Sequence, residues 1–155
     1  MLEDKLKAVV RDIVDFPQPG IVFKDITPIL KDPDLCSEII IEIANSLKDT
    51  KIDVIAGIES RGFLFGLMLA NYMKIPFVPI RKQGKLPFKT ISESYKLEYG
   101  QATIEIHEDA FEEGTNVLIH DDLLATGGTV VAAAKLVEKL GGNVAGFSFI
   151  ISLDF

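Results

Sequence analysis

Val117-Leu-Ile-His-Asp-Asp-Leu-Leu-Ala-Thr-Gly-Gly-Thr129 is the stretch of this sequence that says most about its fold. A short β-branched and aliphatic run that ends at a turn is typical of a buried strand. This run ends in two acids, Asp121 and Asp122, and the small-residue loop from Ala125 to Thr129 then opens into an Ala-rich segment. Thr-Gly-Gly-Thr before such a segment is typical of a helix entrance. The order predicts that both carboxylates lie at the carboxyl end of a strand.

The same loop has the chemistry of a phosphate site. In an open α/β sheet, ligands bind just beyond the carboxyl ends of the strands. The unpaired amides and positive end of a helix attract an anion, and Gly127 and Gly128 let backbone N–H groups approach it. Thr126 and Thr129 can add hydroxyl donors. Two nearby carboxylates would repel a bare anion, so we expect them to face a sugar diol, with or without Mg2+.

Apolar runs and helical patterns alternate along the rest of the chain. Strands are predicted over residues 52–57, 76–80, 116–120 and 144–152, and helices over 63–73, over 129–140 and from Asp32-Pro33 onward. This alternation predicts an α/β fold with a mostly parallel twisted sheet flanked by helices. Apolar residues at helical spacing also predict one amphipathic helix over residues 1–16.

Residues 81–116 interrupt the alternation. Within them, residues 95–99 and 102–106 alternate in polarity like the arms of an antiparallel hairpin around Gly100. Connections this long are often lids or binding loops, so we expect this insert to close over the site as a lid. A hairpin that merely decorates the sheet edge is the alternative.

Length and composition exclude several classes of protein. With 155 residues, of which 48% are hydrophobic, we expect a single domain over residues 1–155. The 16 basic and 23 acidic side chains give a net charge of −7, so no nucleic-acid partner is expected. One cysteine and two distant histidines form no zinc spacing, and no common nucleotide-binding glycine motif occurs. The lone Cys36 and the lack of a membrane-length apolar run or signal peptide indicate a cytoplasmic protein.

The stretch from Val117 to Thr129 resembles the phosphoribosyl pyrophosphate (PRPP) signature of the type I phosphoribosyltransferases. The resemblance implies that Asp121 and Asp122 hold the ribose hydroxyls, and that the 5-phosphate lies on Ala125, Thr126, Gly127, Gly128 and Thr129. His120 departs from the pattern, because the family usually has an aliphatic residue there; we expect it to be a plain strand residue. An ordinary strand, turn and helix with a solvated acidic turn is the alternative.

Four more segments, residues 16–28, 56–66, 80–87 and 95–100, resemble the branch of this family that acts on adenine. The last two resemble its cationic loop and its flexible hood, which implies that residues 81–116 form a cationic loop and hood insert. The resemblance implies a cis peptide bond between Glu59 and Ser60. It places pyrophosphate on Glu59, Ser60, Arg61, Arg81, Lys82 and Lys85. It also implies that Phe23 stacks on adenine, that backbone groups of Val22 and Lys24 read its edge, and that Leu153 packs on the opposite face.

The implied reaction transfers the 5-phosphoribosyl group of PRPP to adenine and gives AMP and pyrophosphate, a step of purine salvage. Glu98 is then the candidate general acid/base, Arg61 the catalytic cation beside the leaving group, and Tyr99 a cover over the site. The implied cofactor is Mg2+, held mainly by the substrate and by Asp121 or Asp122. Family members are commonly homodimers, which we adopt as an expectation.

Three other functions fit parts of the sequence. A non-catalytic PRPP sensor would keep the acidic loop but carry degraded base and hood motifs. A phospho-receiver domain also has an acidic pair beyond a strand, although its pair belongs near the first strand. An enzyme of the same class could act on hypoxanthine or guanine, against which the segment around Phe23 argues.

Overall fold

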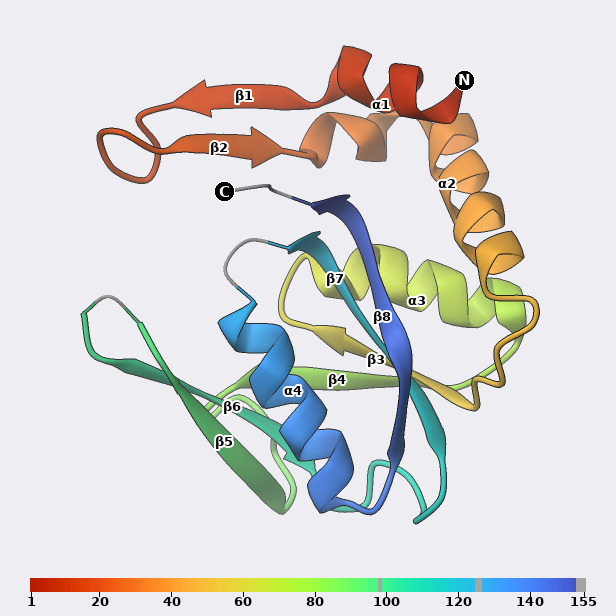
Figure 1. The fold of residues 1–155 in the computed structure, drawn as a ribbon, viewed down its shortest axis with the longest axis vertical. Helices are drawn as coiled ribbons and strands as arrows, with labels where there is room; N and C mark the ends of the chain where they lie inside the picture. The colour runs from red at the N-terminus through yellow and green to blue at the C-terminus, as the bar shows by residue number, and fades with distance from the viewer. Residues whose placement is uncertain (98, 125–126, 153–155) are drawn as a thin grey trace. The chain divides into compact units, whose positions relative to one another are not determined.

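The computed structural model describes residues 1–97, 99–124 and 127–152 of the chain (Figure 1). The chain folds into two compact units, Met1–Ile43 and Ala44–Phe155. Its organisation as one functional domain stays a prediction. No helix within the described residues has the length and apolar character needed to cross a membrane.

The N-terminal unit contains two short strands, the first of which lies where the sequence pattern predicted helix. Its elements are α1 (Leu2–Val9), β1 (Arg11–Val14), β2 (Val22–Asp25), the 3-10 helix η1 (Thr27–Lys31) and the start of α2 (Pro33–Ser46). The prediction of one helix over residues 1–16 is therefore wrong beyond Val9. Ile13 and Val14 have helical spacing, but they pair with Phe23 and Val22 across an antiparallel ladder. Those backbone bonds come from residues later in the chain, which local periodicity cannot include.

The predicted start of α2 is confirmed. The side-chain oxygen Oδ1 of Asp32 accepts the backbone N–H of Leu35 at 3.0 Å, directly before the proline at the first helical position. This bond satisfies one of the amides that a helix leaves unpaired at its start.

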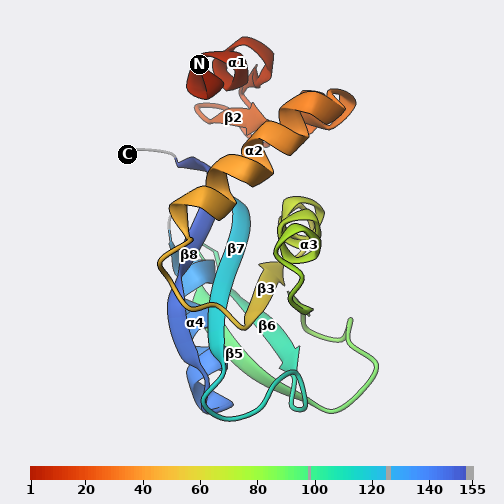
Figure 2. The same ribbon diagram turned by 90° about the vertical axis from the view of Figure 1, so that its right-hand side faces the viewer.

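The larger unit is built around a six-stranded sheet (Figure 2). In chain order its elements are β3 (Val54–Ile58), α3 (Gly62–Met73), β4 (Phe77–Lys82), β5 (Thr90–Lys96), β6 (Gln101–His107), β7 (Asn116–Leu124), α4 (Gly128–Lys139) and β8 (Asn143–Ser152). The strand order is β5-β6-β4-β3-β7-β8, with parallel pairing from β4 to β8 and antiparallel pairing at β5 and β6. Helices α3 and α4 cover opposite faces of this sheet (Figures 1 and 2). The predicted mostly parallel sheet flanked by helices is confirmed.

Strand β7 runs further than its apolar run suggested. The predicted strand ended at His120, whereas the observed one continues to Leu124 and includes both acids. Its pairing with β3 stops at His120, but its pairing with β8 continues to the bridge between Leu124 and Ser152. Asp121 and Asp122 therefore lie beyond the last residue paired with β3, in a part of β7 that is still hydrogen-bonded to β8.

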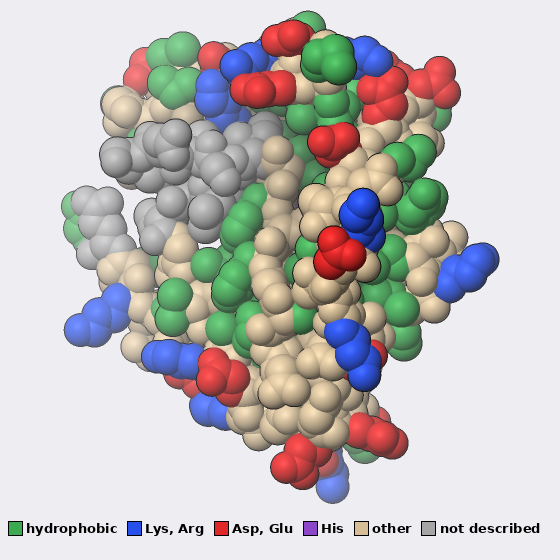
Figure 3. All heavy atoms as spheres, turned by 45° about the vertical axis from the view of Figure 1, so that its right-hand side comes forward, with side chains coloured by type: hydrophobic (Ala, Val, Ile, Leu, Met, Phe, Trp, Pro, Cys, Tyr) green, Lys and Arg blue, Asp and Glu red, His purple; other side chains and the backbone are tan. Residues whose placement is uncertain are grey.

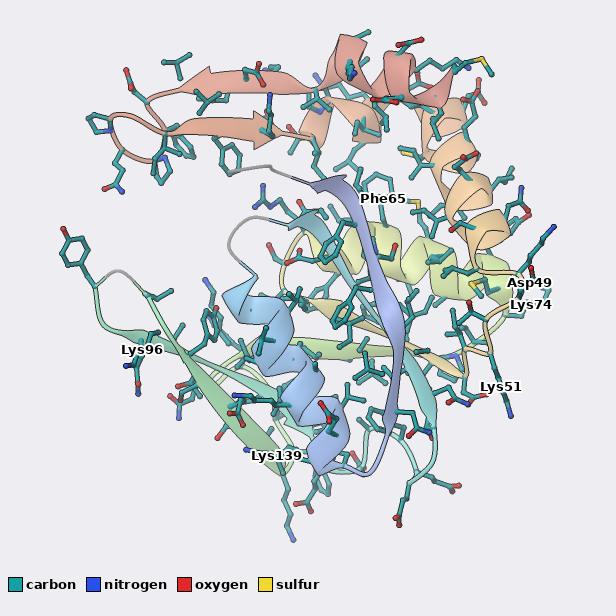
Figure 4. All side chains as sticks on the ribbon, in the orientation of Figure 1. Asp49, Lys51, Phe65, Lys74, Lys96 and Lys139 are labelled. Atoms are coloured by element: carbon teal, nitrogen blue, oxygen red, sulfur yellow. The ribbon has the colours of Figure 1, made fainter. Side chains whose placement is uncertain are left out.

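The predicted hairpin around Gly100 is confirmed, but its first arm begins at Thr90 and ends at Lys96, earlier than the predicted residues 95–99. Its first arm is tied to the C-terminal end of α4, because the Lys139 ammonium donates to the carbonyl oxygen of Ser92 at 3.0 Å and pairs with the Glu93 carboxylate. Figure 4 shows Lys139 on α4, and Lys96 further along β5 toward the tip of the hairpin. The base of the hood is thus part of the sheet.

Candidate active site

The turn after β3 gathers the predicted pyrophosphate residues. Its Glu59–Ser60 peptide bond is cis, as the resemblance implied. The carboxylate oxygen Oε1 of Glu59 accepts the backbone N–H of Lys82 at 2.8 Å and the Nε–H of Arg81 at 3.1 Å. The Arg81 guanidinium also lies 5.9 Å from the centre of the Phe63 ring. Two cationic residues at the end of β4 are thereby fixed beside the start of α3.

Opposing effects act on the ionisation of Glu59. Burial alone would raise the pKa of Glu59, but the hydrogen bonds from Lys82 and Arg81 and the positive charges of both residues outweigh it and lower that pKa. Glu59 therefore stays ionised near neutral pH and orients Arg81. Lys85, at the far side of the turn around Gly84, is exposed and completes the cationic loop.

Arg61 and Asp122 bring the two predicted halves of the site together. Nε of Arg61, the residue that precedes α3, lies 3.1 Å from Oδ2 of Asp122 near the end of β7. The Asp122 side chain is 2% exposed and that of Arg61 is 37% exposed. Between them, Gly62 allows α3 to approach β7, since a Cβ there would lie 3.0 Å from the carbonyl oxygen of His120. The cation thus contacts the acid with one face still open to a ligand.

The neighbouring Asp121 is strongly affected by its surroundings. Burial, a hydrogen bond with the Asp122 side chain and the negative charge of Asp122 raise the pKa of Asp121 from 3.8 to about 8, against the opposing charge of Arg61. Its Oδ1 also accepts the backbone N–H of Asp122 at 2.8 Å. The Asp121 carboxyl therefore carries a proton near neutral pH in the absence of a ligand.

The start of α4 lies beside strand β5 of the hairpin. Gly127 precedes the helix with φ of 86°, and Gly128 is its first residue. Both glycines line a groove of about 340 Å3 between α4 and β5, together with Ser94, Tyr95, Lys96 and Lys135. The groove combines backbone amides at a helix start with two cationic side chains, which is suited to an anion.

His120 is a buried residue of strand β7. It is 0% exposed, and its Nδ1 lies 3.2 Å from Oγ of Ser148 on β8. Burial lowers the pKa of His120 to about 4, although the charge of Asp122 acts in the opposite direction. The ring is therefore neutral at physiological pH. The local sequence did not indicate that Ser148 contacts His120 or that Phe63 contacts Arg81, because each residue lies on a different strand or helix from its partner.

The residues assigned to adenine lie on β2 of the N-terminal unit. Phe23 faces the Phe16 ring edge-on, with 5.3 Å between the ring centres. Val22 is 48% exposed, and the Lys24 ammonium pairs with the carboxylate of Asp12. Tyr99 at the tip of the hood is 85% exposed. Four predicted site residues, Ala125, Thr126, Glu98 and Leu153, lie outside the described residues.

The surface drawn in Figure 3 has Lys and Arg side chains interspersed with Asp and Glu. Among the described residues on this face, no continuous basic area of the kind that binds nucleic acid is visible. Within the same described part of the chain, no cluster of three or more His, Cys, Asp or Glu side chains could hold a metal ion.

We expect the raised pKa of Asp121 to appear in the pH dependence of stability. Because folding raises the pKa of Asp121, this group stabilises the folded protein fully at pH values below its unfolded pKa, which is near 4. The stabilisation is lost as the pH rises toward the folded pKa of about 8. Between those values, the free energy of unfolding of the ligand-free protein should fall by on the order of 6 kcal/mol more than that of Asp121→Asn. Urea unfolding of both proteins from pH 4 to 9 measures the difference. Parallel pH profiles would show that Asp121 ionises normally.

Comparisons with known proteins agree with this arrangement. A family model described as "Phosphoribosyl transferase domain" matches residues 24–152. An adenine phosphoribosyltransferase of Cytophaga hutchinsonii is 54% identical over 155 residues, which are 100% of this chain and 86% of the relative.

Solved structures give the same result. The crystal structure of adenine phosphoribosyltransferase from Thermoanaerobacter pseudethanolicus has a TM-score of 0.95 and 53% identity, covering 98% of this chain and 88% of that one. The enzyme from Saccharomyces cerevisiae, solved with adenine and an imino-altritol bisphosphate, has a TM-score of 0.94 and 41% identity over 99% of this chain and 90% of that one. The chain therefore belongs to the phosphoribosyltransferase family and, within it, to the adenine phosphoribosyltransferases.

Proposed function

We propose that this chain transfers the 5-phosphoribosyl group from PRPP to adenine and releases AMP and pyrophosphate, the reaction of a purine salvage enzyme. The contact between Arg61 and Asp122 at 3.1 Å is the observation that carries the proposal. It joins a cation suited to pyrophosphate with an acid suited to ribose hydroxyls at one edge of the sheet. Adenine is present in the solved structure of the Saccharomyces cerevisiae enzyme, and we assign adenine to this chain because the two proteins are similar.

The leaving group is neutralised by the cations around the β3 turn. Displacement of pyrophosphate from the anomeric carbon passes through an oxocarbenium-like centre, as glycosyl transfer generally does. Arg61 and Arg81 take the departing oxygens, with Lys82 and Lys85 adding charge and Ser60 a hydroxyl. Glu59 orients Arg81 through the bond of 3.1 Å. Fixed cations aimed at developing negative charge lower the barrier without reorganising during the step.

The pentose and its phosphate lie between β7 and α4. The 5-phosphate is bound by the amides and hydroxyls from Ala125 to Thr129, and the ribose hydroxyls donate to Asp121 and Asp122. As pyrophosphate draws the Arg61 guanidinium away, Oδ2 of Asp122 loses its ion-pair partner and becomes available to a ribose hydroxyl. Ligand binding thus replaces the 3.1 Å ion pair by contacts to the substrate.

Adenine binds in an apolar slot, where main-chain groups recognise its edge. Phe23 stacks on the base, backbone groups of Val22 and Lys24 pair with its edge, and Leu153 covers the other face. An apolar slot with a few placed donors and acceptors can recognise a neutral base without a charged side chain. In the hood, Glu98 exchanges a proton with the imidazole nitrogen of the purine and Tyr99 covers the site, so that closure excludes water.

Mg2+ is the proposed cofactor. Because no cluster of three or more protein ligands occurs among the described residues, most of its ligands would be oxygens of pyrophosphate, ribose and water, with Asp121 or Asp122 as the protein contribution. When bound, Mg2+ supplies positive charge to the leaving group. We also propose that the enzyme is a cytoplasmic homodimer with one functional domain.

The activity is tested by mixing the protein with Mg2+, PRPP and one purine base at a time. We expect AMP and pyrophosphate from adenine, and at least about 100-fold less nucleotide from hypoxanthine or guanine, because a base that leaves buried polar groups unpaired is rejected strongly. A PRPP sensor would form no nucleotide with any base. Equal turnover of hypoxanthine would contradict the assignment of the base slot.

A further inference from the structure

Two buried polar atoms in the described part of the chain lack a hydrogen-bond partner, and both belong to β7. They are Nε2 of His120 and Oδ2 of Asp122, in side chains whose residues are 0% and 1% exposed. Such atoms are costly to leave unpaired, and native proteins usually satisfy them with a neighbour or an ordered water. Because the two residues are two positions apart on one strand, their side chains lie on the same face of the sheet.

Helix α3 covers both atoms. A Cβ at Gly66 would lie 3.5 Å from Cδ2 of His120, the ring carbon bonded to Nε2. Arg61, at the start of the same helix, lies 3.1 Å from Oδ2 of Asp122. The unpaired Nε2 of His120 and Oδ2 of Asp122, which is ion-paired with Arg61, are therefore both enclosed beneath the first turns of α3.

The hydrogen bond made by Nδ1, the other ring nitrogen of His120, determines whether Nε2 carries a proton and can donate. Nδ1 of His120 lies 3.2 Å from Oγ of Ser148, and these two residues are paired in the register of β7 and β8. A fully buried imidazole without a direct ion pair is neutral and carries one proton. If the Ser148 hydroxyl donates to Nδ1, that proton is on Nε2. With the opposite tautomer, Nδ1–H would donate to the Ser148 oxygen and Nε2 would have no proton to direct toward Asp122.

We infer that His120 is a positioning residue for Asp122. The Ser148 hydroxyl donates to Nδ1, and Nε2–H donates through one bridging water to Oδ2 of Asp122. A water is required because the two atoms are not in direct hydrogen-bond contact. Two successive hydrogen bonds of ~2.8 Å span the gap that i and i+2 side chains leave on a strand.

The consequence for the reaction rests on the proposed function, in which Asp122 receives a ribose hydroxyl. A carboxylate offers about four acceptor positions, so a bond from His120 leaves others for the substrate. The bridge holds the carboxylate in one orientation when Arg61 moves to pyrophosphate. Without it, part of the binding energy of PRPP would be used to order Asp122.

The tautomer of His120 can be measured without any enzymatic activity. Long-range 15N–1H correlation spectra distinguish a protonated from an unprotonated ring nitrogen, and the chain has two histidines. In His107, Nε2 accepts the backbone N–H of Phe88 at 3.3 Å, so its neutral ring carries the proton on Nδ1 and is an internal reference. We expect His120 to show the opposite tautomer, protonated on Nε2. Protonation of His120 on Nδ1 would overturn the inference, whether or not the protein converts PRPP.

Substitutions at His120 separate positioning from folding. Gln places an amide nitrogen near the position of Nε2, whereas Asn places one near Nδ1 and Leu keeps neither. We expect His120→Asn and His120→Leu to raise KM for PRPP by about ten-fold, the effect of losing a bond to a charged group, with kcat changed by less than about two-fold. His120→Gln should restore KM to within about three-fold of the wild type. A purely structural role predicts a smaller active fraction, hence a lower apparent kcat, an unchanged KM and no advantage of Gln over Asn; that result would overturn the inference.

Discussion

Gly127→Val is expected to lower kcat/KM for PRPP by about 10²–10³-fold, comparable to the loss of preorganised anion donors. Gly127 precedes α4 with φ of 86°, a conformation that a β-branched residue adopts only with strain. Relief of that strain would turn the loop amides away from the 5-phosphate, and the added methyl groups would occupy the path of approach. Steady-state kinetics with varied PRPP and calorimetric titration of PRPP measure the loss.

Gly114→Val is the matched control for this substitution. Gly114 also has φ of 86°, and at both glycines an added Cβ meets no atom of the described residues within 4 Å. Both substitutions should therefore cost a similar 1–2 kcal/mol or so of stability from the left-handed backbone. Gly114 lies in the turn before β7, where its N–H donates to the carbonyl oxygen of Gly141 at 2.9 Å. Folded Gly114→Val should retain normal kinetics; equal losses in both variants would mean that strain, and not the phosphate cradle, explains the effect.

Arg61→Ala is expected to lower kcat by about 10²–10³-fold and to destabilise the protein as well. The lost turnover reflects the missing cation at the leaving group. The destabilisation arises because Asp122, 2% exposed, would keep a buried charge without its partner at 3.1 Å. Since the Arg61 side chain is 37% exposed, water screens part of that pair, and we expect a cost of about 1–3 kcal/mol. Urea unfolding and steady-state kinetics measure the two effects independently.

The double variant Arg61→Ala with Asp122→Asn separates stability from catalysis. Asn removes the unpaired buried charge, so most of the lost stability should return while turnover stays low. Arg61→Lys keeps the charge but loses the planar two-pronged contact with phosphate oxygens, and it should give an intermediate kcat. If the double variant recovered both stability and turnover, Arg61 would act only by neutralising Asp122, and its role at pyrophosphate would be contradicted.

Elements with a strong local pattern could be predicted from the sequence. Apolar runs bounded by turns located β3, β4, β7 and β8, and the order of strands and helices predicted a mostly parallel sheet, as observed. Asp32 followed by Pro33 marked the start of α2 because the cap is formed by residues adjacent in the chain. Gly100 marked the hairpin for the same reason, since a positive φ of 83° there is a local requirement.

Predictions failed where a distant partner determined the structure. The N-terminal residues 11–14 had helical spacing but became β1, because β2 supplied hydrogen bonds that outweighed the local preference. The end of β7 was placed four residues early, because β8 continues to pair with it past the acids. His120 was predicted to be a plain strand residue, and its buried position agrees, but its bond to Ser148 joins residues 28 positions apart.

By itself, the sequence determined the class of fold, the position of a glycine loop at the entrance of α4 and the set of acids and cations that a phosphorylated sugar requires. These depend on periodicity, turn chemistry and charge, which are properties of neighbouring residues. Only the tertiary structure decided that Arg61 contacts Asp122, that Glu59 orients Arg81, and that Asp121 holds a raised pKa. Those properties arise from burial and from contacts between side chains on different strands, and both exist only after the sheet has brought those strands together.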